Sequence, residues 1–397
     1  MQAPGNTMVG MATTVSDVYD LPPEHKEFRA TIRQIVEERV RPRAAEIDRA
    51  GEYPWDIRRL LAEHDILALP FAPEYGGTGT GTLMLQVAVE EIARACASSA
   101  LILMIQELGT LPIQMFGSDA LKERFLPRCA TGEWTPAFCL SEPEAGSDPA
   151  SLRTTAVRDG DEWVINGTKN WITNASIADF YVVFARTPPE ERDSRPRMSA
   201  FVVEKDRPGF SVPKLEHKLG IKGSPTGSPV FEDVRVPAEN LIGTEGKGLS
   251  IALATLERTR LGAAAQAVGI AQGATDYANQ YAKERVAFGQ PIHDFQGIQF
   301  KLADMETRTA AARELLYKAC AMADRDEPGL GKWTSMAKLF ASDTAMAVTV
   351  DAVQVLGGYG YVSEYPVERM MRDAKITQIY EGTNEIQRLV IARAMRG

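Results

Sequence analysis

The chain is poor in the residues that build metal centres and disulfide frameworks. Its 397 residues include four cysteines and four histidines, all widely scattered. No C-x-x-C pair occurs and no histidine lies near a cysteine, so we expect neither a metal site nor a disulfide framework. A glycine-rich G-x-G-x-x-G fingerprint after a strand is also missing, which gives no support to a Rossmann nucleotide site. If this protein carries out redox chemistry, the electrons must go to an organic cofactor.

Charge and hydropathy exclude further classes of protein. The formal net charge is −9, which argues against nucleic acid or an anionic membrane as the main partner but leaves room for a local basic site. No apolar run approaches the length that is needed to cross a bilayer. Residues 1–15 are small and polar and lack the pattern of a signal peptide, so we expect a loose tail at residues 1–20. The simplest interpretation is a cytoplasmic enzyme.

Apolar spacing changes twice along the chain and divides it into three segments. Helical spacing extends from about residue 23 to residue 134, and short strands with turns follow to about residue 242. Long, alanine-rich helical segments fill the rest, as in the core of a helix bundle. We therefore predict an α+β fold with a helical, a β and a second helical domain at residues 21–135, 136–243 and 244–397.

Turn residues locate individual strands in the central segment. Residues 155–158 and 163–165 flank the turn D-G-D, which predicts a β-hairpin. Further strands are expected at residues 180–184, 199–203 and 230–236, with a charged surface loop at residues 188–192. A β-domain of about a hundred residues is within the usual range of domain sizes.

The segment I-Y-E-G-T-N-E-I-Q, residues 379–387, places one carboxylate at a break between two helices. A helical pattern precedes it, and Gly382 interrupts that pattern as a helix-ending glycine does. Thr383 or Asn384 then caps the next helix, with Gln387 at capping-box spacing from Asn384. At such a break the glutamate side chain is able to point into a cavity. The alternative for an isolated E-G-T is a solvated linker glutamate.

Two segments of the expected β-domain are suited to a flat ring. Residues 138–148 form a strand with a hydroxyl and then a turn of small residues, whose backbone N–H groups can meet an electron-rich ring edge. Gly146 permits close approach and Ser147 adds a hydroxyl. Trp171 and Thr173, two apart on an expected strand, place an indole face and a hydroxyl on one side. The alternatives are an ordinary strand-turn and a core tryptophan.

These segments, in this order, resemble the acyl-CoA dehydrogenase family of flavoenzymes, and the similarity extends from about residue 23 to residue 396. Further matches are L-E-R-T-R at residues 256–260, R-V-A-F-G at 285–289, F-Q at 295–296 and Q-V-L-G-G-Y-G at 354–360. The resemblance implies an N-terminal helical domain, a central β-domain and a C-terminal helical domain like a four-helix bundle.

The resemblance implies FAD as the cofactor. In the family, the segment like residues 138–147 cradles the isoalloxazine ring, and the one like residues 171–173 covers its other edge. Arg285 and residues 354–358 resemble the parts that hold the FAD pyrophosphate and adenosine, typically from a neighbouring subunit, so a homotetramer is implied. The FAD-binding residues that the resemblance implies are Phe138, Leu140, Ser141, Gly146, Ser147, Trp171, Ile172, Thr173, Arg285, Phe288, Phe295, Gln296, Gln354, Val355, Gly357, Gly358, Thr383 and Glu385.

The implied reaction is α,β-desaturation of an acyl-CoA thioester to the trans-2-enoyl-CoA. Glu381 matches the base that removes the α-proton, and burial should bring its pKa closer to working pH. In the family, the backbone N–H of the base and a flavin hydroxyl bond the thioester carbonyl. Some relatives place the base at the position of Thr259, which cannot serve. The matched substrate contacts are Ser147, Glu257, Arg260 and Gly382. For Glu257 and Arg260 the alternative is a surface ion pair.

The acyl group and the electron acceptor are less well defined. In the family the floor of the acyl pocket comes from the helix like residues 98–109, where residues 101–105 are apolar and Gln106 and Glu107 follow. We expect an apolar pocket for a short to medium acyl chain, and the absence of arginine here disfavours a dicarboxylic acyl-CoA. Alternatively, the same leucines face the core. The implied acceptor is an electron-transferring flavoprotein. The alternatives are an acyl-CoA oxidase that uses oxygen, and a flavin-binding homologue or partner subunit without turnover.

Overall fold

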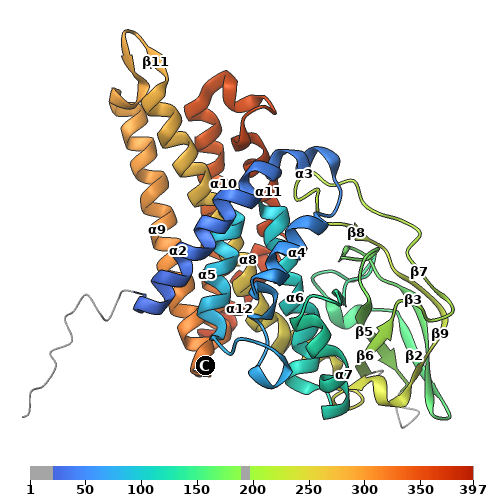
Figure 1. Cartoon of the computed structure of the whole chain (residues 1–397). Helices are drawn as coiled ribbons and strands as arrows, with labels where there is room; N and C mark the ends of the chain where they lie inside the picture. The colour runs from blue at the N-terminus through green and yellow to red at the C-terminus, as the bar shows by residue number, and fades with distance from the viewer. Residues whose placement is uncertain (1–20, 189–196, 397) are drawn as a thin grey trace, which may run out of the picture.

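Helices, strands and helices follow one another along the chain (Figure 1). The computed structural model describes residues 21–188 and 197–396. The tail expected at residues 1–20 and most of the surface loop expected at residues 188–192 lie outside the described residues. The α-β-α order that the apolar spacing predicts is confirmed.

The N-terminal region surrounds one long apolar helix, α6 (Ala97–Phe116), with shorter helices. α6 contacts α5 (Gly81–Ala95), strand β1 (Pro136–Cys139) and helix α8 (Gly248–Glu284). A helix that is apolar on all sides has to lie inside the fold. The other elements are α2 (Pro23–Ile35), η1 (Val36–Val40), η2 (Arg41–Arg43), α3 (Ala44–Ala50), α4 (Trp55–Glu63), η3 (Ile66–Ala68), η4 (Pro73–Tyr75) and α7 (Asp119–Ala130).

Within the described residues, eight strands form one sheet in the order β10-β6-β5-β2-β3-β9-β7, with β1 paired parallel to β5. The expected hairpin is confirmed, because β2 (Thr155–Asp159) and β3 (Glu162–Thr168) pair antiparallel. The other elements of this region are η5 (Pro149–Ser151), β4 (Ile172–Thr173), β5 (Phe180–Thr187), β6 (Arg197–Glu204), β7 (Phe210–Ser211), β8 (Thr226–Gly227), β9 (Val230–Pro237), η6 (Ala238–Asn240) and β10 (Leu241–Ile242).

Strand β5 joins the sheet to the helices because both of its faces are buried. Alternate residues of a strand point to opposite faces. Phe180 and Phe184 belong to an apolar cluster with Phe125 of α7, whereas Tyr181 belongs to a second cluster with Trp163 of β3. The sheet is thus anchored on the N-terminal helices by one face, which fixes the position of β1 and of the loop that follows it.

The C-terminal region is a bundle whose alanines allow close helix packing. α8 contacts α5, α9 (Gln296–Asp324) and α10 (Leu330–Leu356), and its alanines between residues 263 and 282 include many that are fully buried. The short hairpin β11 (Val286–Ala287) and β12 (Gln290–Pro291) forms a tip far from the sheet (Figure 1). The other elements are η7 (Ile292–Asp294), η8 (Gly357–Tyr361), α11 (Pro366–Thr377) and α12 (Asn384–Ala394).

Two helical stretches, Ala97–Phe116 and Leu330–Tyr361, are long and apolar enough by composition to cross a bilayer. The expectation that no apolar run approaches this length is therefore wrong. Protein buries 72% of the apolar window in Ala97–Phe116, and α10 packs against α8, α9 and α11. Burial in the helical core accounts for the first stretch and for half of the apolar window in the second, which is 50% buried.

Candidate active site

The loop between α11 and α12 has an unusual backbone. Helix α11 ends at Thr377, and Glu381 and Gly382 then both adopt left-handed conformations with φ of 55° and 87°. A residue other than glycine is strained there, and such strain persists only where the surroundings hold it. A Cβ at Gly382 would lie 2.7 Å from the amide nitrogen of Gln387. Both residues are thus fixed in one conformation by their neighbours.

Buried polar side chains hold this loop in place. The Gln387 amide donates to the carbonyl oxygens of Glu381 at 3.1 Å and Gly382 at 2.8 Å. Lys338 on α10, which is fully buried, donates from Nζ to the Gly382 oxygen at 2.8 Å and to Asn384 Oδ1 at 2.9 Å. The expected capping box on Asn384 is therefore wrong. Thr383, one residue earlier, caps α12, and its hydroxyl accepts from the N–H of Ile386.

The carboxylate of Glu381 points into the protein. Thr259 on α8 donates from Oγ1 to Glu381 Oε2 at 2.8 Å. Burial raises the pKa of Glu381, whereas the Thr259 hydrogen bond and the cations of Arg260 and Lys338 lower it. The side chain keeps part of its surface accessible, as a ligand-binding group requires. This geometry contradicts the alternative of a solvated linker glutamate.

Arg260 also points into the bundle. Its side chain is buried, and Nη1 donates to Ser335 Oγ on α10 at 2.7 Å. Its Nε has no hydrogen-bond partner in the part of the chain that the structure describes. The surface ion pair considered for Glu257 and Arg260 is therefore wrong, because the neighbouring Arg258 makes the exposed pair instead, with Asp326.

We expect Lys338→Met to lower the free energy of unfolding by about 1–3 kcal/mol, because the Gly382 carbonyl and Asn384 would lose a buried donor. Urea denaturation of the purified variant measures this change. Lys375→Met is the matched control, since Lys375 is an exposed lysine on α11. A Lys338 variant as stable as the control would show that Lys338 does not hold the loop.

The two segments that were predicted to cradle the flavin ring lie side by side. The Asn170 N–H donates to the Ser141 carbonyl at 2.9 Å. Lys169, which is fully buried, donates to the Leu140 carbonyl at 3.3 Å and to Glu142 Oε1 at 2.7 Å. The predicted residues gathered here are Phe138, Leu140, Ser141, Gly146, Ser147, Trp171, Ile172 and Thr173.

The surface of this region has room for a flat ligand. The Trp171 indole is 60% exposed, and nothing lies within 4 Å of a Cβ built on Gly146. Strand β4 contains only Ile172 and Thr173, and Trp171 precedes it with φ of 61°. The expectation that Trp171 and Thr173 share one extended strand is therefore wrong, although the indole is exposed beside the loop that follows β1. The residues present here fit an isoalloxazine ring.

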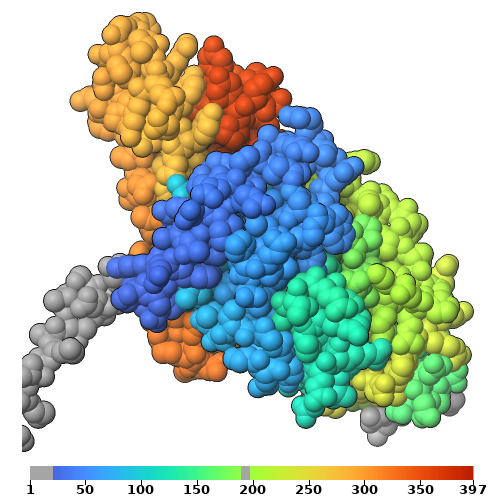
Figure 2. All heavy atoms as spheres, viewed as in Figure 1, coloured from blue at the N-terminus to red at the C-terminus, as the bar shows by residue number. Residues whose placement is uncertain are grey.

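A second group of predicted residues lies at the far tip of the bundle. Arg285, Val355, Gly357 and Gly358 line an open cavity of about 520 Å³. The Arg285 guanidinium lies over the Tyr359 ring at 5.4 Å. In the space-filling view this tip projects clear of the N-terminal helices (Figure 2). The predicted residues in the chain segments of this tip are called the tip group below. They are Arg285, Phe288, Phe295, Gln296, Gln354, Val355, Gly357 and Gly358.

The structure thus separates the predicted FAD residues into two groups within one chain (Figure 1). Thr383 and Glu385 belong to neither group, because they adjoin the Glu381 loop at the start of α12. Phe288 is 97% exposed, and its ring meets only that of Phe295, at a centroid distance of 6.0 Å, among the described aromatic residues. A single chain therefore leaves the tip group uncovered.

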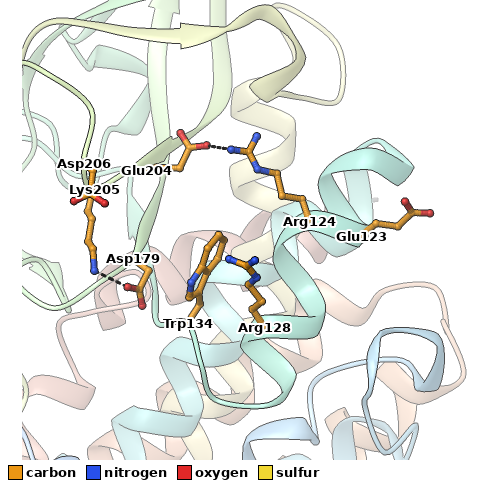
Figure 3. Close-up of a pocket in the computed structure, with 8 residues that line it drawn as sticks. All are labelled: Glu123, Arg124, Arg128, Trp134, Asp179, Glu204, Lys205 and Asp206. Carbon is orange, nitrogen blue, oxygen red and sulfur yellow. Dashed lines mark hydrogen bonds and ion pairs between the residues drawn. The ribbon is translucent and has the colours of Figure 1, made fainter.

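Another cavity, of about 630 Å³, lies between α7 and the sheet and contains none of the predicted site residues (Figure 3). Four of its charged groups form pairs: Arg124 with Glu204 at 2.5 Å, and Lys205 with Asp179 at 2.8 Å. Arg128 lies over the Trp134 ring at 4.5 Å. Since this cavity contains none of the predicted site residues and lies away from Glu381, it is not the candidate active site.

Comparison with known proteins agrees with the fold. Models of the N-terminal, middle and C-terminal domains of acyl-CoA dehydrogenase match residues 22–133, 137–234 and 246–396. The three-domain order, helical, β and helical, is that of this class of enzyme. The chain belongs to the acyl-CoA dehydrogenase family, whose members depend on FAD.

Relatives and solved structures resemble the chain over almost its whole length. It is 48% identical to a probable acyl-CoA dehydrogenase of Mycobacterium leprae over 389 residues, which cover 98% of this chain and 100% of the relative. It is 50% identical to the cyclohexane-1-carbonyl-CoA dehydrogenase of Geobacter metallireducens over 365 residues, covering 91% and 95%. The butyryl-CoA dehydrogenase structure of Megasphaera elsdenii matches with a TM-score of 0.91 and 43% identity, covering 96% and 100%.

Proposed function

We propose that the protein desaturates an acyl-CoA thioester between its α- and β-carbons, gives the trans-2-enoyl-CoA, and passes the electrons to an electron-transferring flavoprotein. The observation that carries this proposal is the buried carboxylate of Glu381, held in a strained loop and bonded to Thr259. When FAD is bound, it supplies the acceptor for the hydride that leaves the β-carbon.

Glu381 acts as the base that takes the α-proton. Burial raises its pKa toward neutrality, while Thr259, Arg260 and Lys338 keep the carboxylate form available. The N–H of Glu381 has no acceptor among the described residues, so it is free to bond the thioester oxygen as negative charge develops there. Ser147, Glu257, Arg260 and Gly382 remain the proposed contacts to the acyl-CoA.

Two chains together complete the FAD site in this proposal. Trp171 and Gly146 would hold the flavin ring, and the tip group of a neighbouring subunit would hold the pyrophosphate and adenosine. Exposed Phe288 and the cavity around Arg285 support this arrangement, because a single chain leaves both uncovered. The oligomer is then part of the site, and we propose a homotetramer.

Anaerobic titration of the FAD-loaded protein with a panel of straight and branched acyl-CoAs tests the function. We expect at least one member to bleach the flavin absorbance, and the reduced flavin to pass its electrons to an electron-transferring flavoprotein much faster than to oxygen. FAD that stays bound while no acyl-CoA bleaches it would refute the proposal. Faster reoxidation by oxygen would assign an oxidase instead.

Arg285→Ala should weaken FAD binding by about tenfold or more, because a charge-assisted contact to the pyrophosphate is lost. Fluorescence titration of the apoprotein with FAD measures the dissociation constant. Arg39→Ala is the matched control, since Arg39 is an exposed arginine of the N-terminal region. Equal FAD affinities in the two variants would remove Arg285 from the site.

A further inference from the structure

A second buried carboxyl group lies in the electrostatic neighbourhood of Glu381. Glu107 on α6 is 7% exposed. Burial, and then the nearby Glu381 carboxylate, raise the pKa of Glu107 to about 8. Glu107 therefore favours its protonated form at neutral pH. The sequence placed Glu107 next to the apolar residues of the expected acyl pocket but assigned it no role.

The only described hydrogen-bond partner of the Glu107 side chain is Gln86 on α5. Gln86 is fully buried, and its Nε2 lies 3.4 Å from Glu107 Oε2, at the limit of a hydrogen bond. Gln86 Oε1 has no partner among the described residues. In the part of the chain that the structure describes, no ion pair joins Glu107 to a cation. The pair is thus buried and incompletely satisfied.

Glycine at position 262 connects this pair to the Glu381 site. A Cβ on Gly262 of α8 would lie 3.7 Å from Gln86 Oε1 and 3.4 Å from Met104. Gly262 lies about one helical turn after Thr259, and Thr259 donates a hydrogen bond to Glu381. Gln86, Glu107 and Glu381 therefore belong to one region enclosed by α5, α6 and α8.

The hydrogen-bonding capacity of the pair identifies the missing ligand group. A protonated carboxyl and an amide each have a donor and an acceptor. One bond between them, whichever way the amide is oriented, leaves at least one donor and one acceptor free. A buried polar group without a partner is costly, and an alkyl chain satisfies neither. A hydroxyl group satisfies both, because it donates and accepts.

We propose that Glu107 and Gln86 bind a hydroxyl group on the acyl chain, so that hydroxyacyl-CoA thioesters are the preferred substrates. This inference rests on the function proposed above, which places the reacting carbons beside Glu381. A ketone would accept only and leave the free acceptor unsatisfied. A second carboxylate on the acyl chain would face the carboxyl groups of Glu107 and Glu381, which disfavours dicarboxylic thioesters.

Matched substrate pairs test the inference. Each pair consists of an ω-hydroxyacyl-CoA and the alkyl acyl-CoA in which a methyl replaces the hydroxyl. In the wild type we expect kcat/KM to favour the hydroxyl member of at least one pair by about tenfold or more. Glu107→Leu should reverse this ratio, and Glu107→Gln, which keeps a donor and an acceptor, should retain it. Met115→Leu, an apolar change at an exposed position of α6, should leave the ratio unchanged.

Calorimetric titration with the corresponding pairs of enoyl-CoA products gives a second readout that needs no turnover. The hydroxyl product should bind the wild type more tightly, and Glu107→Leu should lose that difference. Equal kcat/KM and equal binding for both members of every pair would overturn the inference alone. Flavin that no acyl-CoA of either kind bleaches would reject the proposed function, and this inference with it.

Discussion

Glu381→Gln is expected to lose flavin reduction by acyl-CoA while FAD stays bound. The amide has the shape of the carboxylate and can still accept from Thr259, but it cannot take up the α-proton. Loss of a positioned general base lowers the rate by about 10²–10⁴-fold. Anaerobic stopped-flow absorbance of the flavin measures the rate, and the ratio of flavin to protein absorbance measures bound FAD.

Glu314→Gln is the matched control for this experiment. Glu314 is an exposed glutamate on α9, so its variant should reduce the flavin at the wild-type rate. Because the pKa of Glu381 is raised by burial, wild-type reduction should become faster as pH rises through that pKa, and this dependence should vanish in Glu381→Gln. Wild-type bleaching in the glutamine variant would assign the base to another residue.

Local sequence patterns were sufficient for the architecture but not for the loop at the site. Turn residues located the β2–β3 hairpin, and the change of apolar period located the transition from helices to strands. They could not decide between Thr383 and Asn384 as the cap of α12, since both residue types cap helices well. The choice depends on Lys338 and Ser342 of α10, which bond the Asn384 side chain from about forty residues away in sequence.

Side-chain directions in the core helices could not be read from periodicity. α6 is buried over most of its length, and apolar or small residues also lie on the less buried sides of α8 and α10, so these sequences have no clear polar face that would orient them. For this reason the sequence did not indicate that Arg260 points inward, that Lys338 holds the Glu381 loop, or that Glu107 interacts electrostatically with Glu381. The one signal in the sequence for these inward-pointing side chains was the presence of polar residues in otherwise apolar helices.

Lys169→Met is expected to lower the free energy of unfolding by about 3–5 kcal/mol, because it leaves the buried Glu142 carboxylate without its cation. Lys169 is fully buried and Glu142 is 6% exposed. The Glu142 carboxylate would keep only the backbone N–H groups of Arg153 and Thr154 as donors. Urea denaturation followed by circular dichroism measures the change.

Lys205→Met is the control. Lys205 pairs with Asp179 at 2.8 Å, close to the 2.7 Å of the Lys169 pair, but is 48% exposed, so its loss should cost less than about 1 kcal/mol. The Lys169 pair also joins the loop at Leu140 to the segment before Trp171. Lys169→Met should therefore release FAD at a lower urea concentration than unfolds the bundle, whereas the control should not. An equal loss of unfolding free energy in both variants would mean that the buried Lys169 pair does not hold the two flavin segments in place.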